Sequence, residues 1–308
     1  MKCIFGLSRI RHYRKPVVAL GVFDGVHLAH RAILKAAIKK ARQIQGTSMA
    51  LTFFPHPQKQ KSLYSLEHRL RLIADLGIEV GVVISFNRRF ARISAEDFIR
   101  RILAQKIGCS YVYVGENFRF GRQAKGDSRL LKEYSSLCHF GLRVFRVRKI
   151  NSRPISSTYI RRLITRGELL KARQLLGRPV SIYGSVTQGI GLARKLGFPT
   201  ANINPHHEVL PPSGVYTVKV SLDDKQGAPQ LKKFNGVCNI GRRPTLNERG
   251  LKNVEVYIFG LTKGIYGKNL EVQFIKKIRE EKKFSSLQAL AAQIKKDVVF
   301  ARKRISLH

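Results

Sequence analysis

The sequence predicts an α/β protein: a doubly wound parallel sheet, followed by an antiparallel β-barrel with a closing helix. Two observations support this prediction. In the first half, short β-rich runs alternate with helical patterns, which favours parallel pairing of the strands. After Gly177 the runs are rich in Val, Ile, Tyr and Phe and are separated by Gly, Pro, Asn and Asp turns, which is typical of an antiparallel barrel or sandwich. We therefore predict one domain over 1–177 and a second over 178–308.

Local signals predict the elements of the first domain. Its expected strands are Val17–Gly21, Met49–Phe54, Val80–Phe86, Tyr111–Val114 and Leu142–Val147. Ser94 with Asp97 three residues later predicts a capped helix start, and Gly108 predicts the end of that helix. Residues 156–176 predict two short helices broken near Gly167.

The second domain is predicted as a barrel closed by a helix. Its expected strands are Val180–Val186, Gly214–Leu222, Lys233–Ile240, Val254–Phe259 and Leu270–Ile278. An amphipathic helix is expected from Ser285 to about Lys303. The apolar residues on one stripe of that helix are Leu287, Leu290, Ala291, Ile294 and Val298.

Composition narrows the class of protein. The chain has 308 residues, of which 44% are hydrophobic, enough for two cores of ordinary size. No apolar run approaches the ~18 residues that a membrane helix needs, and the first residues do not form a secretory signal. The four cysteines are scattered, so the sequence predicts neither a zinc site nor a disulfide framework. We expect a soluble, cytoplasmic protein with no membrane partner and no dedicated protein partner.

The charge balance is strongly basic. Against 19 acidic residues the chain has 58 Lys and Arg, which gives a net charge of +39. Such a surplus attracts nucleic acid or a polyphosphate. The basic residues are spread over nearly every segment, however, and form no long tail. A solvated basic surface is therefore the preferred interpretation, and nucleic acid is a possible partner but not the favoured one.

The stretch "ALGVFDGVHLAHRAIL" predicts a strand, a tight turn and a helix. Backbone N–H groups at such a helix start favour an anion such as phosphate, and His27 and His30 would lie beside it on one face. The alternative is a solvated first turn or half of a metal site. The turn residues expected to contact phosphate are Gly21, Phe23, Asp24 and Gly25.

Two further segments have the features of phosphate or nucleotide sites. "VYVGENFRFG" places Asn117, Phe118 and Arg119 just beyond the fourth strand, at the same sheet edge as the two histidines. "RPISSTYIRR" gathers hydroxyl and guanidinium groups at a helix start, which suits a polyphosphate, although Ser and Thr also serve as simple N-caps. Its candidate residues are Arg153, Ser156, Ser157, Thr158 and Arg161.

The second half contains a glycine-rich segment over 184–197, followed by Thr200 and Asn202. Glycines let the backbone approach a phosphate closely, and a Thr/Asn pair can hold Mg²⁺ and phosphate oxygens. Glu255 lies between apolar residues in "NVEVYIF", and we expect its carboxylate to point into the barrel. Taken alone, Glu255 is a structural residue; a buried carboxylate is otherwise paired or catalytic.

These motifs together resemble the prokaryotic bifunctional riboflavin kinase/FMN adenylyltransferase (FAD synthetase) family over nearly the whole chain. The motifs that carry the resemblance are "GVFDGVHLAH", "FFPHP", "VGENFRFG", "RPISSTYIR", "GFPTANI", "PPSGVYTV", "NIGRRPT", "VEVYIF", "YGK" and "EEKKFSSLQAL". The first few indicate only the wider nucleotidyltransferase superfamily, whereas "GFPTAN" followed by "NIGRRPT" is much more specific.

The resemblance implies two activities that use riboflavin, FMN and ATP as substrates, with Mg²⁺. In the barrel, Glu255 would be the general base for riboflavin phosphorylation, with Thr200 and Asn202 on Mg²⁺-ATP. In the first domain the FMN phosphate would attack the α-phosphate of ATP, and His27 and His30 would stabilise the developing charge. In the kinase domain, the residues implied to cover the ATP phosphates are Gly189, Gly191 and Lys195. In the first domain, the implied flavin-binding residues are Pro55, His56, Asn117, Phe118 and Arg119.

The sequence departs from the family pattern at three positions. Ala29 stands where the family turn H-x-G-H has glycine, Ala193 stands at a flap glycine, and Ile265 stands at an expected Asp. Ala29 leaves open a riboflavin kinase with an impaired adenylyltransferase site. A basic nucleic-acid-binding protein on the same scaffold is a third, less favoured interpretation.

Overall fold

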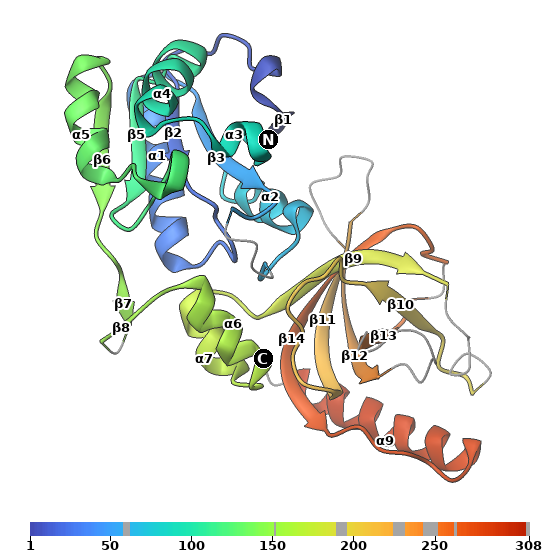
Figure 1. Ribbon diagram of the computed structural model, residues 1–308. Coiled ribbons are helices and arrows are strands. Elements are labelled where there is room, and N and C mark those ends of the chain that lie inside the picture. Colours follow the sequence, from blue (N-terminus) through green and yellow to red (C-terminus); the bar gives the residue numbers. More distant parts are fainter. Residues whose placement is uncertain are drawn as a thin grey trace. The chain divides into compact units, whose positions relative to one another are not determined.

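The computed structural model in Figure 1 describes residues 1–57, 62–150, 152–188, 196–223, 232–242, 252–261 and 264–305. The chain divides into two compact units, Met1–Ser157 and Thr158–His308. The predicted domain boundary after residue 177 stays a prediction, because a division by contacts does not decide which activity the helices of 157–176 serve. In the described residues no helix has both the length and the apolar character that crossing a bilayer requires.

The first unit is a parallel sheet with the strand order β1-β4-β3-β2-β5-β6, and every neighbouring pair in it is parallel. Its strands are β1 (Lys2–Phe5), β2 (Val17–Leu20), β3 (Ser48–Phe54), β4 (Val80–Ser85), β5 (Tyr111–Gly115) and β6 (Gly141–Phe145). The predicted doubly wound sheet is therefore confirmed. The edge strand β1 was not predicted, because its four residues show no alternation and only one of them is buried.

Helices cover both faces of this sheet (Figure 1). Alternate strand residues reach opposite faces, so Val17 and Ala19 pack with α1 (Leu28–Gln43) and α2 (Leu66–Ala74), whereas Val18 and Leu20 pack on the other face. That second face is covered mainly by α4 (Ala95–Asp97), its π-helical continuation η2 (Phe98–Ile107) and α5 (Ser128–Leu137). The smaller elements are η1 (Leu7–Arg9), α3 (Arg88–Ala91), η3 (Arg122–Ala124), β7 (Lys149–Ile150) and β8 (Arg153–Pro154).

The predicted helix boundaries are confirmed where a cap signalled them. Ser94 Oγ accepts the Asp97 amide at 3.0 Å, and Gly108 ends η2 with a φ of +66°. The sequence predicted an ordinary helix after Asp97, whereas the chain there is π-helical. The two helices predicted over 156–176 are α6 (Ser157–Thr165) and α7 (Leu169–Leu176).

The second unit contains a closed, wholly antiparallel barrel in the order β10-β13-β12-β11-β14-β9, with β9 pairing back to β10. Its strands are β9 (Ser181–Thr187), β10 (Thr200–Asn204), β11 (Gly214–Asp223), β12 (Lys232–Arg242), β13 (Lys252–Ile258) and β14 (Asn269–Arg279). The barrel is as predicted, with one correction. Residues 200–204, which follow the glycine-rich segment, form a strand that was not among the predicted ones.

The last helix, α9 (Leu287–Ile305), packs on the outside of the barrel (Figure 1). Val298 and Ala301 contact Val215 and Val237 from β11 and β12. The predicted apolar stripe is only partly correct, since Leu287 remains 51% exposed.

Candidate active sites

In the first unit, β2 and β5 form the topological switch point of the sheet. β3 and β4 follow on one side of β2, and β6 follows on the far side of β5. Doubly wound sheets bind ligands at this point, beyond the carboxyl ends of the strands. The turn after β2 contains Gly21 to Val26, and the turn after β5 contains Asn117 to Arg119. The structure therefore brings these two predicted segments to one edge, beside each other.

Buried side chains hold the carbonyl group of Val22 in the first of these turns. Thr52 Oγ1 donates to it at 2.8 Å and Arg69 Nη1 at 2.7 Å. Because the C=O and the following N–H of a trans peptide point in opposite directions, these bonds direct the Phe23 N–H away from the sheet interior. Arg69 is 1% exposed, and its burial lowers its pKa while the nearby Asp24 charge opposes that shift.

Asp24 fixes the middle of the turn. Its carboxylate accepts the Leu63 amide at 2.8 Å and the Tyr64 amide at 3.4 Å, and its carbonyl accepts the Ser157 hydroxyl at 2.8 Å. Asp24 is 2% exposed, so its side chain holds the turn in place and does not face solvent.

The turn is also strained. Phe23 and Val26 have φ values of +54° and +39°, a region that side chains rarely adopt, and Gly25 has +81°. Strain of this kind persists where surrounding contacts fix the backbone, and it clusters at functional sites. The Phe23 side chain is fully buried and meets the His30 ring edge to face at 5.4 Å.

His27 and His30 form a stacked pair at the start of α1. Their ring centroids lie 3.6 Å apart with an interplanar angle of 17°. His27 is the N-cap, and its Nδ1 accepts the His30 amide at 3.4 Å. An Nδ1 atom that accepts carries no proton, so the ring proton of neutral His27 lies on Nε2.

The remaining candidates of the first unit follow β3 and β5, the two strands next to β2. Pro55 and His56 directly follow β3, the neighbour of β2. Asn117 and Arg119 are exposed, whereas the Phe118 ring stacks against Phe120 at 5.8 Å and belongs to the aromatic cluster on that face. Their position at one edge is consistent with a common site.

The segment before α6 contributes to the same turn through one residue. Ser157 bonds to the Asp24 carbonyl, and Ser156 directly precedes it. Arg153 is exposed on β8. Thr158 and Arg161 lie in α6, within the second unit.

In the second unit, Glu255 lies in the middle of a polar row. On β13 it is paired with Asn202 of β10 on one side and with Asn239 of β12 on the other. Asn253 Nδ2 donates to Glu255 Oε1 at 2.7 Å. Thr200 is two residues from Asn202 and therefore on the same face of β10.

The expectation that Glu255 points into the barrel is wrong. Val254 and Val256 are fully buried and Ile258 is 5% exposed, so they fill the interior, and Glu255 lies on the opposite, outer face with partial exposure. An interior position would have left its charge without polar partners.

Gly241 lies two residues beyond Asn239, on the same face of β12. A Cβ on Gly241 would come 2.6 Å from Glu281 Oε1 and 3.4 Å from Asn239 Nδ2, so a side chain at 241 would displace the Glu281 carboxylate from its present position. Among the family departures, Ile265 is buried at 8% exposure. Gly189, Gly191, Ala193 and Lys195 lie outside the described residues.

The residues at these sites that were not candidates from the sequence include Thr52, Arg69, Asn239 and Asn253. Arg69 had a signal, because it is a charged residue four positions before buried Ile73 on the inner face of α2. Asn253 also had a sequence signal, since it is two residues before Glu255 and therefore on the same face of the strand. Asn239 is the first residue of the motif "NIGRRPT", but only the strand pairing shows that it lies beside Glu255.

Comparisons with known proteins assign a family to each half of the chain. Residues 10–159 match the FAD synthetase family, and residues 176–305 match the riboflavin kinase family. The bifunctional riboflavin kinase/FMN adenylyltransferase of Buchnera aphidicola is 34% identical, and the match covers 100% of each chain. The enzyme of the same name from Haemophilus influenzae is 36% identical over 92% of each chain.

The chain belongs to this family. It is an enzyme of FAD synthesis with an ATP-using FAD synthetase domain followed by an ATP-using riboflavin kinase domain. The resemblance predicted from the motifs is confirmed.

A solved structure shows the same fold along the chain. That protein, described as a macrolide-efflux protein from Streptococcus pneumoniae, is matched over 98% of this chain and 99% of its own, with a TM-score of 0.81 and 27% identity. The fold of both domains is thus shared with that protein.

Proposed function

We propose that the two sites act in sequence, converting riboflavin to FMN and FMN to FAD. What supports this order is the match of both family domains to one chain. In each domain several candidate residues also lie near one another, at the turn after β2 and in the row around Glu255.

For the kinase step, Glu255 accepts the proton of the riboflavin 5′-hydroxyl. The hydroxyl oxygen then forms a bond to the γ-phosphorus of ATP, and ADP leaves with the electron pair of the broken P–O bond. The amide of Asn253 holds one carboxylate oxygen of Glu255, which orients the base. The glycine-rich segment is proposed to cover the phosphates.

Thr200 and Asn202 are proposed to hold Mg²⁺. Their hydroxyl and amide oxygens lie on the face of Glu255, and such hard oxygen donors suit this ion, which keeps several waters and phosphate ligands. When bound, Mg²⁺ neutralises charge on the phosphates.

For the adenylyl transfer, a phosphate oxygen of FMN forms a bond to the α-phosphorus of ATP, and pyrophosphate leaves. His27 donates from Nε2 to the charged phosphate oxygens, with His30 beside it, and the α1 N-terminus adds its dipole. Gly21, Phe23, Asp24 and Gly25 contribute through the backbone of the fixed turn. The further contacts proposed for ATP are Arg153, Ser156, Ser157, Thr158 and Arg161, and those proposed for the flavin are Pro55, His56, Asn117, Phe118 and Arg119.

The test is to incubate the purified protein with ATP and Mg²⁺ and either riboflavin or FMN, and to separate the flavins by chromatography. FAD from both reactions supports two working sites and shows that Ala29 is tolerated. FMN without FAD would leave a riboflavin kinase with an impaired adenylyltransferase site, and no product would overturn the proposal. Omitting Mg²⁺ or replacing it with Mn²⁺ tests the metal.

A cytoplasmic location is also proposed, since all four cysteines are free thiols.

A further inference from the structure

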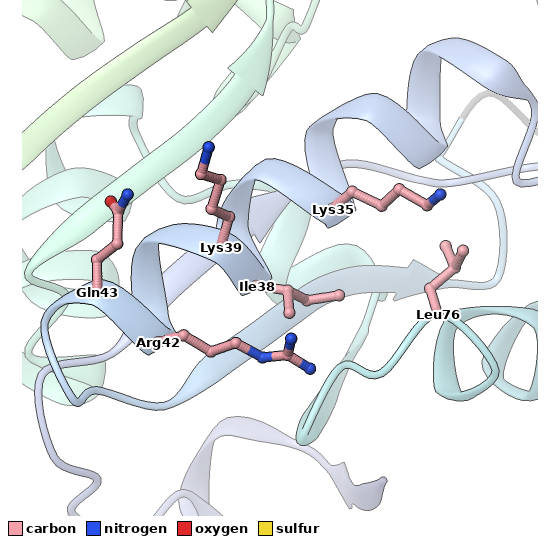
Figure 2. A pocket seen from close by; sticks show the side chains of 6 residues that line it. All are labelled: Lys35, Ile38, Lys39, Arg42, Gln43 and Leu76. Atoms are coloured by element: carbon pink, nitrogen blue, oxygen red, sulfur yellow. The ribbon is translucent and has the colours of Figure 1, made fainter.

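The outer side of the first unit carries a groove that neither activity uses. A cavity of about 380 Å³ lies between α1 and the end of α2. Figure 2 shows Lys35 and Arg42 extending toward the side of α1 on which Leu76 lies, with Ile38 between them. The lining residues are Lys35, Ile38, Lys39, Arg42, Gln43 and Leu76.

The lining combines three cations with a small apolar floor. Lys35, Lys39 and Arg42 are exposed, and in the part of the chain that the structure describes none of them forms an ion pair. Ile38 is 7% exposed and Leu76 is half-buried. No carboxylate lines the groove, so it presents only positive charge to a ligand.

The far end of the groove is separate from the proposed adenylyltransferase site. α1 starts at the carboxyl edge of the sheet with His27 and His30, and it rises about 1.5 Å per residue. Arg42 follows His30 by twelve positions, and therefore lies about 18 Å further along the helix. A nucleotide at the histidines does not reach the far end of the groove.

The spacing of the cations suits a repeating anion. Lys35 and Arg42 are seven positions apart, which is about 10 Å along the helix, with Lys39 between them. Phosphates on one strand of a duplex advance about 3.4 Å each along the duplex axis, so a row of this length laid along that axis spans about three of them. The net charge of +39 adds a long-range attraction for such a polyanion.

We propose that this groove binds the phosphodiester backbone of a nucleic-acid strand without sequence preference. Gln43 is the one amide among the lining residues, and no carboxylate lines the groove, so few groups could read base edges. Contacts to phosphate carry no sequence information. A membrane surface is a weaker candidate, because every exposed lining residue is polar and Ile38 is already buried.

The test compares two full-length variants with equal charge. The groove variant is Lys35→Gln, Lys39→Gln and Arg42→Gln; glutamine keeps the helix propensity of these positions. The control variant replaces three exposed lysines of α9: Lys295→Gln, Lys296→Gln and Lys303→Gln. Binding of a fluorescein-labelled oligouridylate of about 12 nucleotides is followed by anisotropy across a salt series, and flavin turnover is measured in parallel.

Three lost phosphate contacts lower the slope of log K against log salt by about 2 for a single strand. We expect that change, with at least about tenfold weaker binding at moderate salt, in the groove variant only, while both variants keep wild-type flavin turnover. An equal effect of both variants would show a diffuse field and overturn the groove. Failure of the wild-type protein to bind the oligonucleotide, or tighter capture by phosphatidylserine vesicles that the groove variant loses, would also overturn it.

Discussion

At the residue scale, the side chains proposed to carry the chemistry also make structural contacts of their own. His27 serves at once as the N-cap of α1 and as half of a stacked imidazole pair, and Glu255 is held by the amide of Asn253. For each of these two residues, a substitution can keep the structural contact and remove the group proposed to react, which separates the two roles.

His27→Asn is such a substitution, because asparagine is a strong N-cap but has no imidazole. We expect FAD formation from FMN to fall about 100-fold or more, the usual effect of removing one preorganised donor. The melting temperature and the riboflavin kinase rate should stay near the wild-type values. Undiminished FAD formation would remove His27 from the proposed mechanism.

Glu255→Gln keeps the oxygen that accepts from Asn253 and removes the proposed base. The rate of riboflavin phosphorylation should fall about 10² to 10⁴-fold, the range that general-base catalysis supplies. FMN adenylylation, measured on the same sample, is the internal control and should not change. If riboflavin is still phosphorylated at the original rate, another group takes the proton.

At the scale of elements, the turn after β2 is held by α2 through the buried guanidinium of Arg69. Arg69→Met removes the charged donor to the Val22 carbonyl and should cost the first unit about 1–3 kcal/mol in the free energy of unfolding. FAD formation should fall with it, because the turn loses its fixed geometry. Arg88→Met, at an exposed position of α3, is the matched control. Equal denaturation midpoints for the two variants would contradict this role of Arg69.

The core between the sheet and η2 contains a thiol whose ionisation the fold resists. Burial raises the pKa of Cys109 from 9.0 to about 12. Between these values the unfolded chain has lost this proton and the folded chain keeps it, so Cys109 lowers stability as pH rises from about 9 toward 12. Urea unfolding of wild type and Cys109→Ala should therefore show a shallower alkaline loss for the variant. Parallel pH profiles would argue against a buried, protonated thiol.

Strand alternation and cap signals predicted most of the fold. The face of Glu255 could also have been predicted, because Asn253, Glu255 and Tyr257 alternate with Val254, Val256 and Ile258, and a barrel interior takes the wholly apolar set. The partnership of Glu255 with Asn202 and Asn239 could not, since it depends on a register between distant strands. Likewise, the sequence placed Phe23 and Asp24 at the turn but did not show that their side chains face inward.

At the scale of the whole molecule, the two activities lie on one chain, and FMN is the product of one and the substrate of the other. Mixing His27→Asn with Glu255→Gln protein should restore FAD synthesis from riboflavin and ATP, because released FMN reaches intact adenylyltransferase sites by diffusion. Neither variant alone should make FAD from riboflavin at more than a trace. A mixture that accumulates FAD no faster than either variant would show that FMN does not leave its site of formation.

The outward position of Glu255 has a consequence for how this enzyme tolerates change during evolution. Along β13 one set of alternate positions fills the core and the other carries Glu255, the proposed base, so both sets are encoded in the same short segment with opposite phase. Exchanges among Val, Ile and Leu at the core positions leave that phase intact. Deleting one residue of β13 on the N-terminal side of Glu255 would turn the carboxylate inward and the following Val256 outward, which would disrupt stability and the proposed catalysis together. In this strand we expect selection to accept substitutions but to reject changes in length.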